Sequence, residues 1–63
     1  MTEERLEAIA KKIRESSNWL SVWAEVEELC KEAGLEEAWE NADGEDFERV
    51  IERAAFILGV EIY

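Results

Sequence analysis

The spacing of the apolar residues restricts the fold of this chain more than any other feature. Between positions 19 and 33 they recur every three or four residues, at Trp19, Trp23, Val26, Cys30 and Ala33. At 100° per residue these side chains project within an arc of ~80°, which is one face of an α-helix. Glu25, Glu28 and Glu32 of the same segment fall near the opposite side. This segment is therefore expected to form an amphipathic helix with one buried face.

The same period appears near both ends of the chain. The first stripe predicts a helix over about residues 3–15, with Thr2 as its N-cap, and consists of Leu6, Ile9, Ala10 and Ile13. The last stripe consists of Phe47, Val50, Ile51, Ala54 and Leu58. Asp43 is expected to cap the start of this last helix, and Gly59 is expected to end it.

A short helical piece is predicted between the second and the last helix. Gly34 followed by Leu35 is typical of a helix C-terminus with an apolar contact behind it. Residues 35–42 then place Leu35, Ala38 and Trp39 on the inner side, and residues 41–44 form a turn. Together these segments predict an all-α fold: a small three-helix bundle with a short extra helical segment between helices 2 and 3, around a Trp-rich core.

Length and composition indicate one folded unit. A chain of 63 residues buries only ~60% of the surface that its unfolded form exposes, so its stability should be modest. Its apolar fraction of 48% is ordinary for a globular protein, and a disordered acidic segment would lack its three tryptophans and two phenylalanines. We expect a single helical domain over residues 1–63.

The negative charge is concentrated in the middle of the chain. Ten of the seventeen acidic residues lie between Glu25 and Asp46, with Lys31 as the only base among them, and the net charge of the whole chain is −10. Binding to a phosphate backbone depends on Lys and Arg, so this balance argues against nucleic acid and against anionic membranes as direct partners. A protein partner is the expectation, either a basic protein or a second copy in a homodimer.

The residues that carry catalytic or metal chemistry are scarce. The chain has no His and one cysteine, Cys30, which falls on the predicted core stripe among acids that raise a thiol pKa. The turn around Gly44 resembles part of a calcium loop, but Trp39 and Val50 would occupy ligand positions and cannot bind calcium. Carboxylate pairs such as Glu36 and Glu40 lie on a face predicted to be solvated, where no pKa is pushed upward. We expect no enzymatic activity, no metal and no cofactor.

The same features suggest where the protein resides. A single cysteine forms no internal disulfide, there is no basic and apolar leader, and no apolar run approaches the ~20 residues of a membrane span. These observations predict a cytoplasmic protein.

The acidic residues on the outer faces form a candidate docking surface, and three interpretations remain open. They can keep the protein soluble, guard against self-association, or steer a basic partner, including as a DNA mimic that inhibits a nucleic-acid-binding protein. The candidate residues are Glu25, Glu28, Glu32, Glu36, Glu37 and Glu40.

Phe56 does not fit the stripe of the last helix, because it points ~180° away from Phe47 at 100° per residue. It can be an isolated surface residue, it can be covered by the C-terminal residues folding back, which we favour, or it can belong to a contact patch. The candidate protein interface consists of Trp19, Phe56, Ile62 and Tyr63.

The sequence thus predicts a non-enzymatic interaction module or small homo-oligomer. Two alternatives remain. One is an engineered helical miniprotein with no natural ligand, which the restricted, Glu-rich composition without Pro or Gln also suits. The other is the acidic inhibitor described above.

Overall fold

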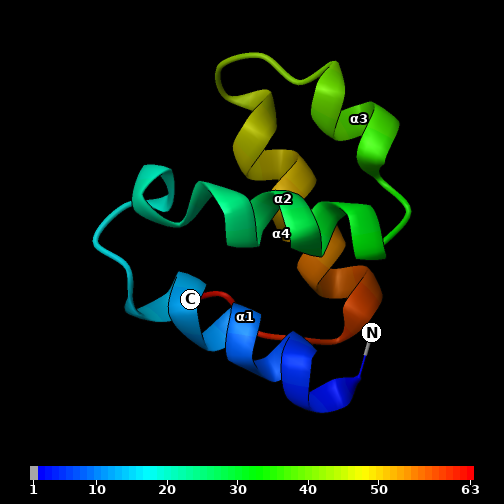
Figure 1. The fold of residues 1–63 in the computed structure, drawn as a ribbon. Coiled ribbons are helices and arrows are strands. Elements are labelled where there is room, and N and C mark those ends of the chain that lie inside the picture. The colour runs from blue at the N-terminus through cyan, green and yellow to red at the C-terminus, as the bar shows by residue number, and fades with distance from the viewer. Residues whose placement is uncertain (1) are drawn as a thin grey trace.

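The computed structural model describes residues 2–63 and contains four α-helices and one 3₁₀-helix. They are α1 (Glu3–Glu15), η1 (Trp19–Val22), α2 (Trp23–Glu32), α3 (Glu36–Glu40) and α4 (Asp46–Leu58). No strand occurs within the described residues. The predicted all-α bundle is confirmed, with α1, α2 and α4 as its main helices and α3 as the short piece between the last two (Figure 1).

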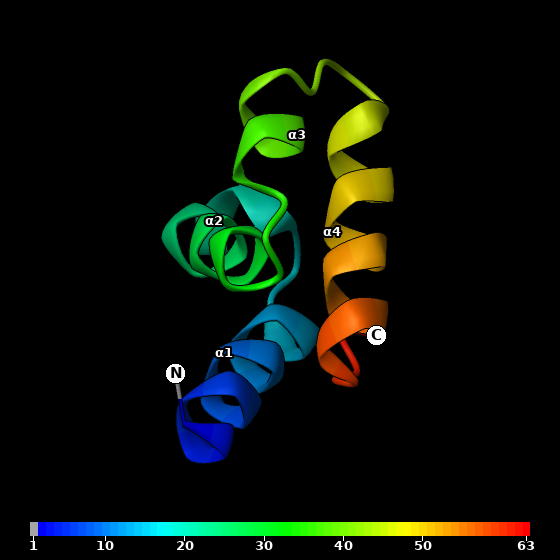
Figure 2. The same ribbon diagram turned by 90° about the vertical axis from the view of Figure 1, so that its right-hand side faces the viewer.

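Helix α2 is the centre of the arrangement, because it packs against both α1 and α4. It runs opposite to α1, while α4 crosses α2 rather than following it (Figures 1 and 2). Helices α2 and α3 lie on one side of α4, and no element of residues 2–63 covers its opposite side in Figure 2.

Local hydrogen bonds explain the bounds of α1. The Thr2 hydroxyl oxygen accepts a hydrogen bond of 3.2 Å from the Arg5 backbone N–H, as an N-cap does. At the other end the Ser16 hydroxyl donates to the Ile13 carbonyl oxygen at 2.7 Å. Both ends agree with the prediction.

The second helix starts later than predicted. Its first turn, η1, is a 3₁₀-helix in which the Asn18 Oδ1 accepts from the Ser21 N–H at 3.2 Å and the Ser21 hydroxyl donates to the Asn18 carbonyl at 2.8 Å. Such local side-chain bonds compete with α-helical ones. The tighter turn moves Trp19 off the α2 stripe, so Trp19 is only half-buried, and the neighbouring Leu20 is 77% exposed.

Glycines end α2 and α4 as predicted. Gly34 has φ of 78°, and the Leu35 N–H then donates to the Cys30 carbonyl oxygen at 2.9 Å. Gly59 has φ of 70° and precedes the matching bond from Val60 to Ala55, at 3.0 Å. At each of these two helix ends, a left-handed glycine followed by such a backbone hydrogen bond forms a Schellman motif.

Two local predictions are wrong. Asp43 does not cap α4 with its side chain; instead its backbone carbonyl oxygen accepts from the Asp46 N–H at 3.0 Å, inside a turn that needs no side chain. Ala38 is exposed rather than inward, because α3 is only five residues long and turns Leu35 and Trp39 towards the core.

The core draws on every α-helix and on the chain after α4. Its buried residues are Ile9, Ala10 and Ile13 of α1, Val26, Leu29 and Cys30 of α2, Trp39 of α3, Ile51, Ala54 and Ala55 of α4, and Ile62. At one end Trp23, Trp39 and Phe47 make a cluster with ring centroids 4.7 to 5.2 Å apart. None of the helices formed by residues 2–63 is long and apolar enough to cross a bilayer.

Candidate functional site

The residues after α4, 60–63, fold back across the bundle and are called the tail. The tail (red in Figure 1) passes beside α1, where the Arg14 Nη1 donates a hydrogen bond of 2.6 Å to the Glu61 carbonyl oxygen. Ile62 is only 4% exposed and belongs to the core. The tail is therefore a fixed part of the fold.

Tyr63 ends the tail on the surface, between η1 and α4. Its ring lies against the Trp19 ring with centroids 5.8 Å apart, and its hydroxyl is 3.5 Å from the Glu48 Oε1, at the outer limit of hydrogen bonding. Desolvation, together with the negative charges of the nearby Glu52 and Glu48 carboxylates, raises the pKa of Tyr63. The Tyr63 ring therefore packs against the Trp19 ring, and its hydroxyl lies near the Glu48 carboxylate.

An open groove of about 490 Å³ runs between the tail and α4. It is called the tail groove and is lined by Glu52, Ala55, Phe56, Val60, Glu61, Ile62 and Tyr63. Its surface is only slightly more apolar than polar, because Glu52 and Glu61 contribute to the lining beside the apolar side chains. The Phe56 side chain is 86% exposed and Tyr63 is 72% exposed, so two aromatic rings border a hollow that residues 2–63 leave open to solvent.

The expectation that the tail covers Phe56 is wrong. Arg14 holds Glu61 towards α1, and Ile62 fills a place in the core, so the tail passes beside Phe56. Of the four candidate interface residues, Phe56 and Tyr63 line the groove with exposed rings, whereas Trp19 lies half-buried against Tyr63. Ile62 contributes to the lining but is buried, so it supports the groove and offers little surface for contact.

The candidate interface predicted from the sequence did not include Glu52, Glu61 or Ile57. Glu52 lies one helical turn before Phe56, a spacing that places both side chains on one face and was available from the sequence. Ile57 is 48% exposed and stands next to Phe56 on the outside of α4. The position of Glu61 depends on the path of the tail, which no local pattern specifies.

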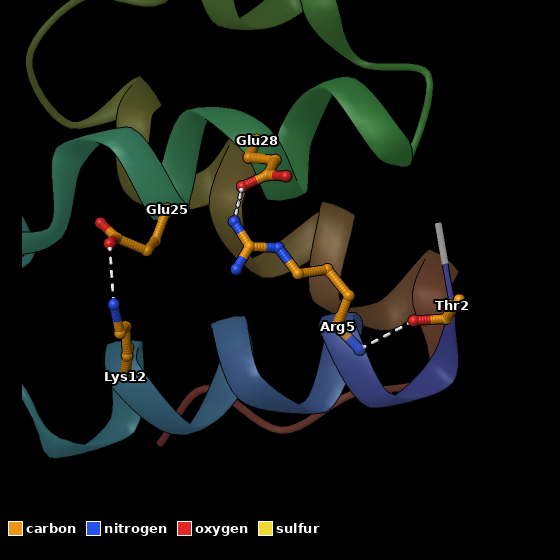
Figure 3. Close-up of polar contacts among 5 residues, drawn as sticks. All are labelled: Thr2, Arg5, Lys12, Glu25 and Glu28. Carbon is orange, nitrogen blue, oxygen red and sulfur yellow. Dashed lines mark hydrogen bonds and ion pairs between the residues drawn. The ribbon is translucent and has the colours of Figure 1, made fainter.

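The six candidate acidic residues do not form one continuous outward face. The Glu28 Oε2 is 2.9 Å from the Arg5 Nη2, and the Glu25 Oε1 is 3.4 Å from the Lys12 Nζ, so these two carboxylates join α2 to α1 (Figure 3). Glu32 is exposed at the end of α2. The three acids of α3 are exposed as well, at Glu36, Glu37 and Glu40.

Cys30 lies in the core as predicted, with no exposed surface. Burial, with a smaller contribution from the Glu27 carboxylate, raises the pKa of its thiol to about 11. The reactive thiolate is therefore disfavoured at neutral pH. No group of three or more potential metal ligands is clustered in the part of the chain that the structure describes.

Comparison with known proteins identified no homologue of this chain. Neither a protein-family model, nor a curated protein, nor a solved structure matches the chain. Function is therefore argued from the residues and their arrangement.

Proposed function

We propose that this protein is a small, non-enzymatic protein-interaction module that binds its partner through the tail groove. The observation that carries the proposal is Phe56, whose ring is 86% exposed beside a hollow lined by apolar and acidic side chains. Single exposed apolar residues are common on protein surfaces. Here, however, the exposed rings of Phe56 and Tyr63 both line one groove, as side chains at protein interfaces do.

The lining indicates the chemistry of the partner. Ala55, Val60 and the two aromatic rings favour an apolar side chain, and the carboxylates of Glu52 and Glu61 favour a neighbouring Lys or Arg. Aromatic faces also attract cations. The net charge of −10 adds long-range steering of basic groups towards the protein.

The groove needs little ordering before it binds. Its tail wall is fixed by the Arg14 hydrogen bond, by burial of Ile62 and by the Trp19 ring against Tyr63. A binding surface that is already in place loses less conformational entropy on association. The acidic surface has weaker support as a docking site, because Glu25 and Glu28 already pair with bases of α1.

The test uses a synthetic amphipathic helical peptide with Leu at every third or fourth position and Lys between, titrated by calorimetry. Phe56→Ser should weaken its binding by at least about tenfold. Leu20→Ser is the matched control, because Leu20 is also highly exposed, at 77%, but does not line the groove. Equal affinities for the wild type and both variants would overturn the proposal, since binding would then be a general effect of charge.

A further inference from the structure

We infer that the partner in the tail groove is a second copy of this chain, in a symmetric dimer whose two α4 helices run parallel. This inference rests on the proposed function and names its occupant. It follows from the distribution of charge and apolar side chains around α4, which places a groove on one flank and its chemical complement on the other.

The outer face of α4 has two unlike flanks on either side of Phe56. At 100° per residue, Glu52 and Glu48 lie ~40° and ~80° to one side of Phe56, whereas Arg49, Arg53 and Ile57 lie ~20°, ~60° and ~100° to the other. All six side chains are exposed. The first is called the acidic flank, consisting of Glu48 and Glu52, and the second the basic flank, consisting of Arg49, Arg53 and Ile57.

The tail groove lies on the acidic flank. Glu52 and Ala55 line it from α4, and Tyr63, which borders Glu48, closes it from the tail. The groove therefore offers carboxylates beside apolar surface. The basic flank offers guanidinium groups beside Ile57, which is 48% exposed. One helix thus carries both an acidic, apolar hollow and a basic, apolar ridge of matching chemistry.

Twofold symmetry determines how two such faces can meet. An axis parallel to α4 brings the acidic flank of each copy against the basic flank of the other, so that Glu52 faces Arg53 twice, with the two Phe56 rings near the axis. An antiparallel pairing brings acidic flank against acidic flank and basic against basic, where like charges repel. Charge complementarity therefore favours the parallel arrangement.

The acidic surface of α2 and α3 opposes self-association. Residues 19–46 carry a net charge of −9, whereas residues 47–63 carry −1. Two copies that approach through α2 or α3 bring the strongly acidic segments together. Residues 1–18 carry no net charge, so repulsion is weak both at α1 and at the face formed by α4 and the tail. That face is also the one that no other element of residues 2–63 covers in Figure 2.

The size of the protein makes the dimer a weak one. A standard interface takes ~800 Å² from each partner. The whole chain exposes 4334 Å², so such an interface would cover about a fifth of its surface. We therefore expect a dimer that forms reversibly with concentration, and that strengthens as salt screens the charge of −10 on each copy.

Sedimentation equilibrium between about 10 and 500 µM tests the inference. The wild-type mass should rise from 7.3 kDa towards twice that value. Arg53→Glu and Glu52→Arg should each weaken association by at least about tenfold, because each places like charges opposite one another. An equimolar mixture of the two variants should recover association, since the reversed charges then face each other across the axis, and Leu20→Ser should associate as the wild type does.

The other outcomes separate this inference from the proposed function. The wild type could stay monomeric at every concentration and salt tested, yet bind the Leu/Lys peptide in a Phe56-dependent way. That result would overturn the inference that a second copy occupies the groove, and it would leave the proposed interaction module intact. A monomer without Phe56-dependent binding overturns both. Association that the variant mixture does not recover overturns the parallel pairing.

Discussion

The Arg14 side chain joins Glu61 to α1 by a hydrogen bond of 2.6 Å from its Nη1 to the Glu61 backbone oxygen, forty-seven residues further along the chain. The Nη2 of the same guanidinium is 3.0 Å from the Glu7 Oε1, which holds the side chain in position. The wall of the tail groove is thus attached to a helix that contributes nothing to its lining. The stability of α1 and the shape of the groove are therefore linked.

Arg14→Ala should release the tail from α1. We expect the free energy of unfolding to fall by about 1–2 kcal/mol, because a charged donor to the Glu61 carbonyl is lost. Amide hydrogen exchange of residues 60–63 should accelerate by more than that of α2. Lys11→Ala is the control, because it removes an exposed base from the same helix. If both variants lose equal stability in urea, the bond to Glu61 does not stabilise the tail.

Ile62→Ala should strongly lower the free energy of unfolding, although the tail is only four residues long. Ile62 is 4% exposed within the core, and removing a buried Ile side chain typically costs 2–5 kcal/mol. Ile57→Ala makes the same chemical change at a position that is 48% exposed, and it should cost less than about 1 kcal/mol. Chemical denaturation of both variants provides the comparison. Equal losses would mean that the tail does not pack into the core.

The repeating apolar pattern was sufficient to predict the helices. Each stripe combines a 3.6-residue period with a local end signal, such as Thr2 before α1 or the left-handed Gly34 and Gly59 after α2 and α4. These signals involve residues close in sequence. The sequence therefore indicated the number, type and approximate bounds of the main helices.

The features that the sequence did not predict depend on tertiary contacts. The tail contains too few residues for a period, so whether Ile62 turned to the core or to Phe56 depended on Arg14, far away in the sequence. The start of α2 is the exception, because it depended on local bonds in which the Asn18 and Ser21 side chains compete with the helical backbone bonds. The tail groove exists only because the tail passes beside Phe56. The place of Glu61 in its lining therefore had no local signal in the sequence.

Tyr63 provides a spectroscopic probe of the groove. Desolvation and the nearby carboxylates of Glu52 and Glu48 raise the pKa of its hydroxyl above that of a free tyrosine. Glu48→Gln should lower that pKa, because it removes a negative charge near the phenolate. Tyr63 is the only tyrosine, so tyrosinate absorbance during a pH titration reports it alone. Glu37→Gln, on α3, is the matched control, and an equal shift in both variants would contradict the contact.

Cys30 should make stability fall in alkaline solution. Burial raises the pKa of its thiol from 9.0 to about 11, so the folded state holds this proton more tightly than the unfolded state does. The corresponding stability is fully present below pH 9 and is lost as pH rises through 11; a shift of this size corresponds to about 2–3 kcal/mol.

Cys30→Ala should be less stable at neutral pH, because it leaves a cavity in the core. Its stability should nevertheless decline less than that of the wild type between pH 9 and 11, as measured by urea unfolding at each pH. Parallel declines would show that other groups, such as the lysines, cause the alkaline loss.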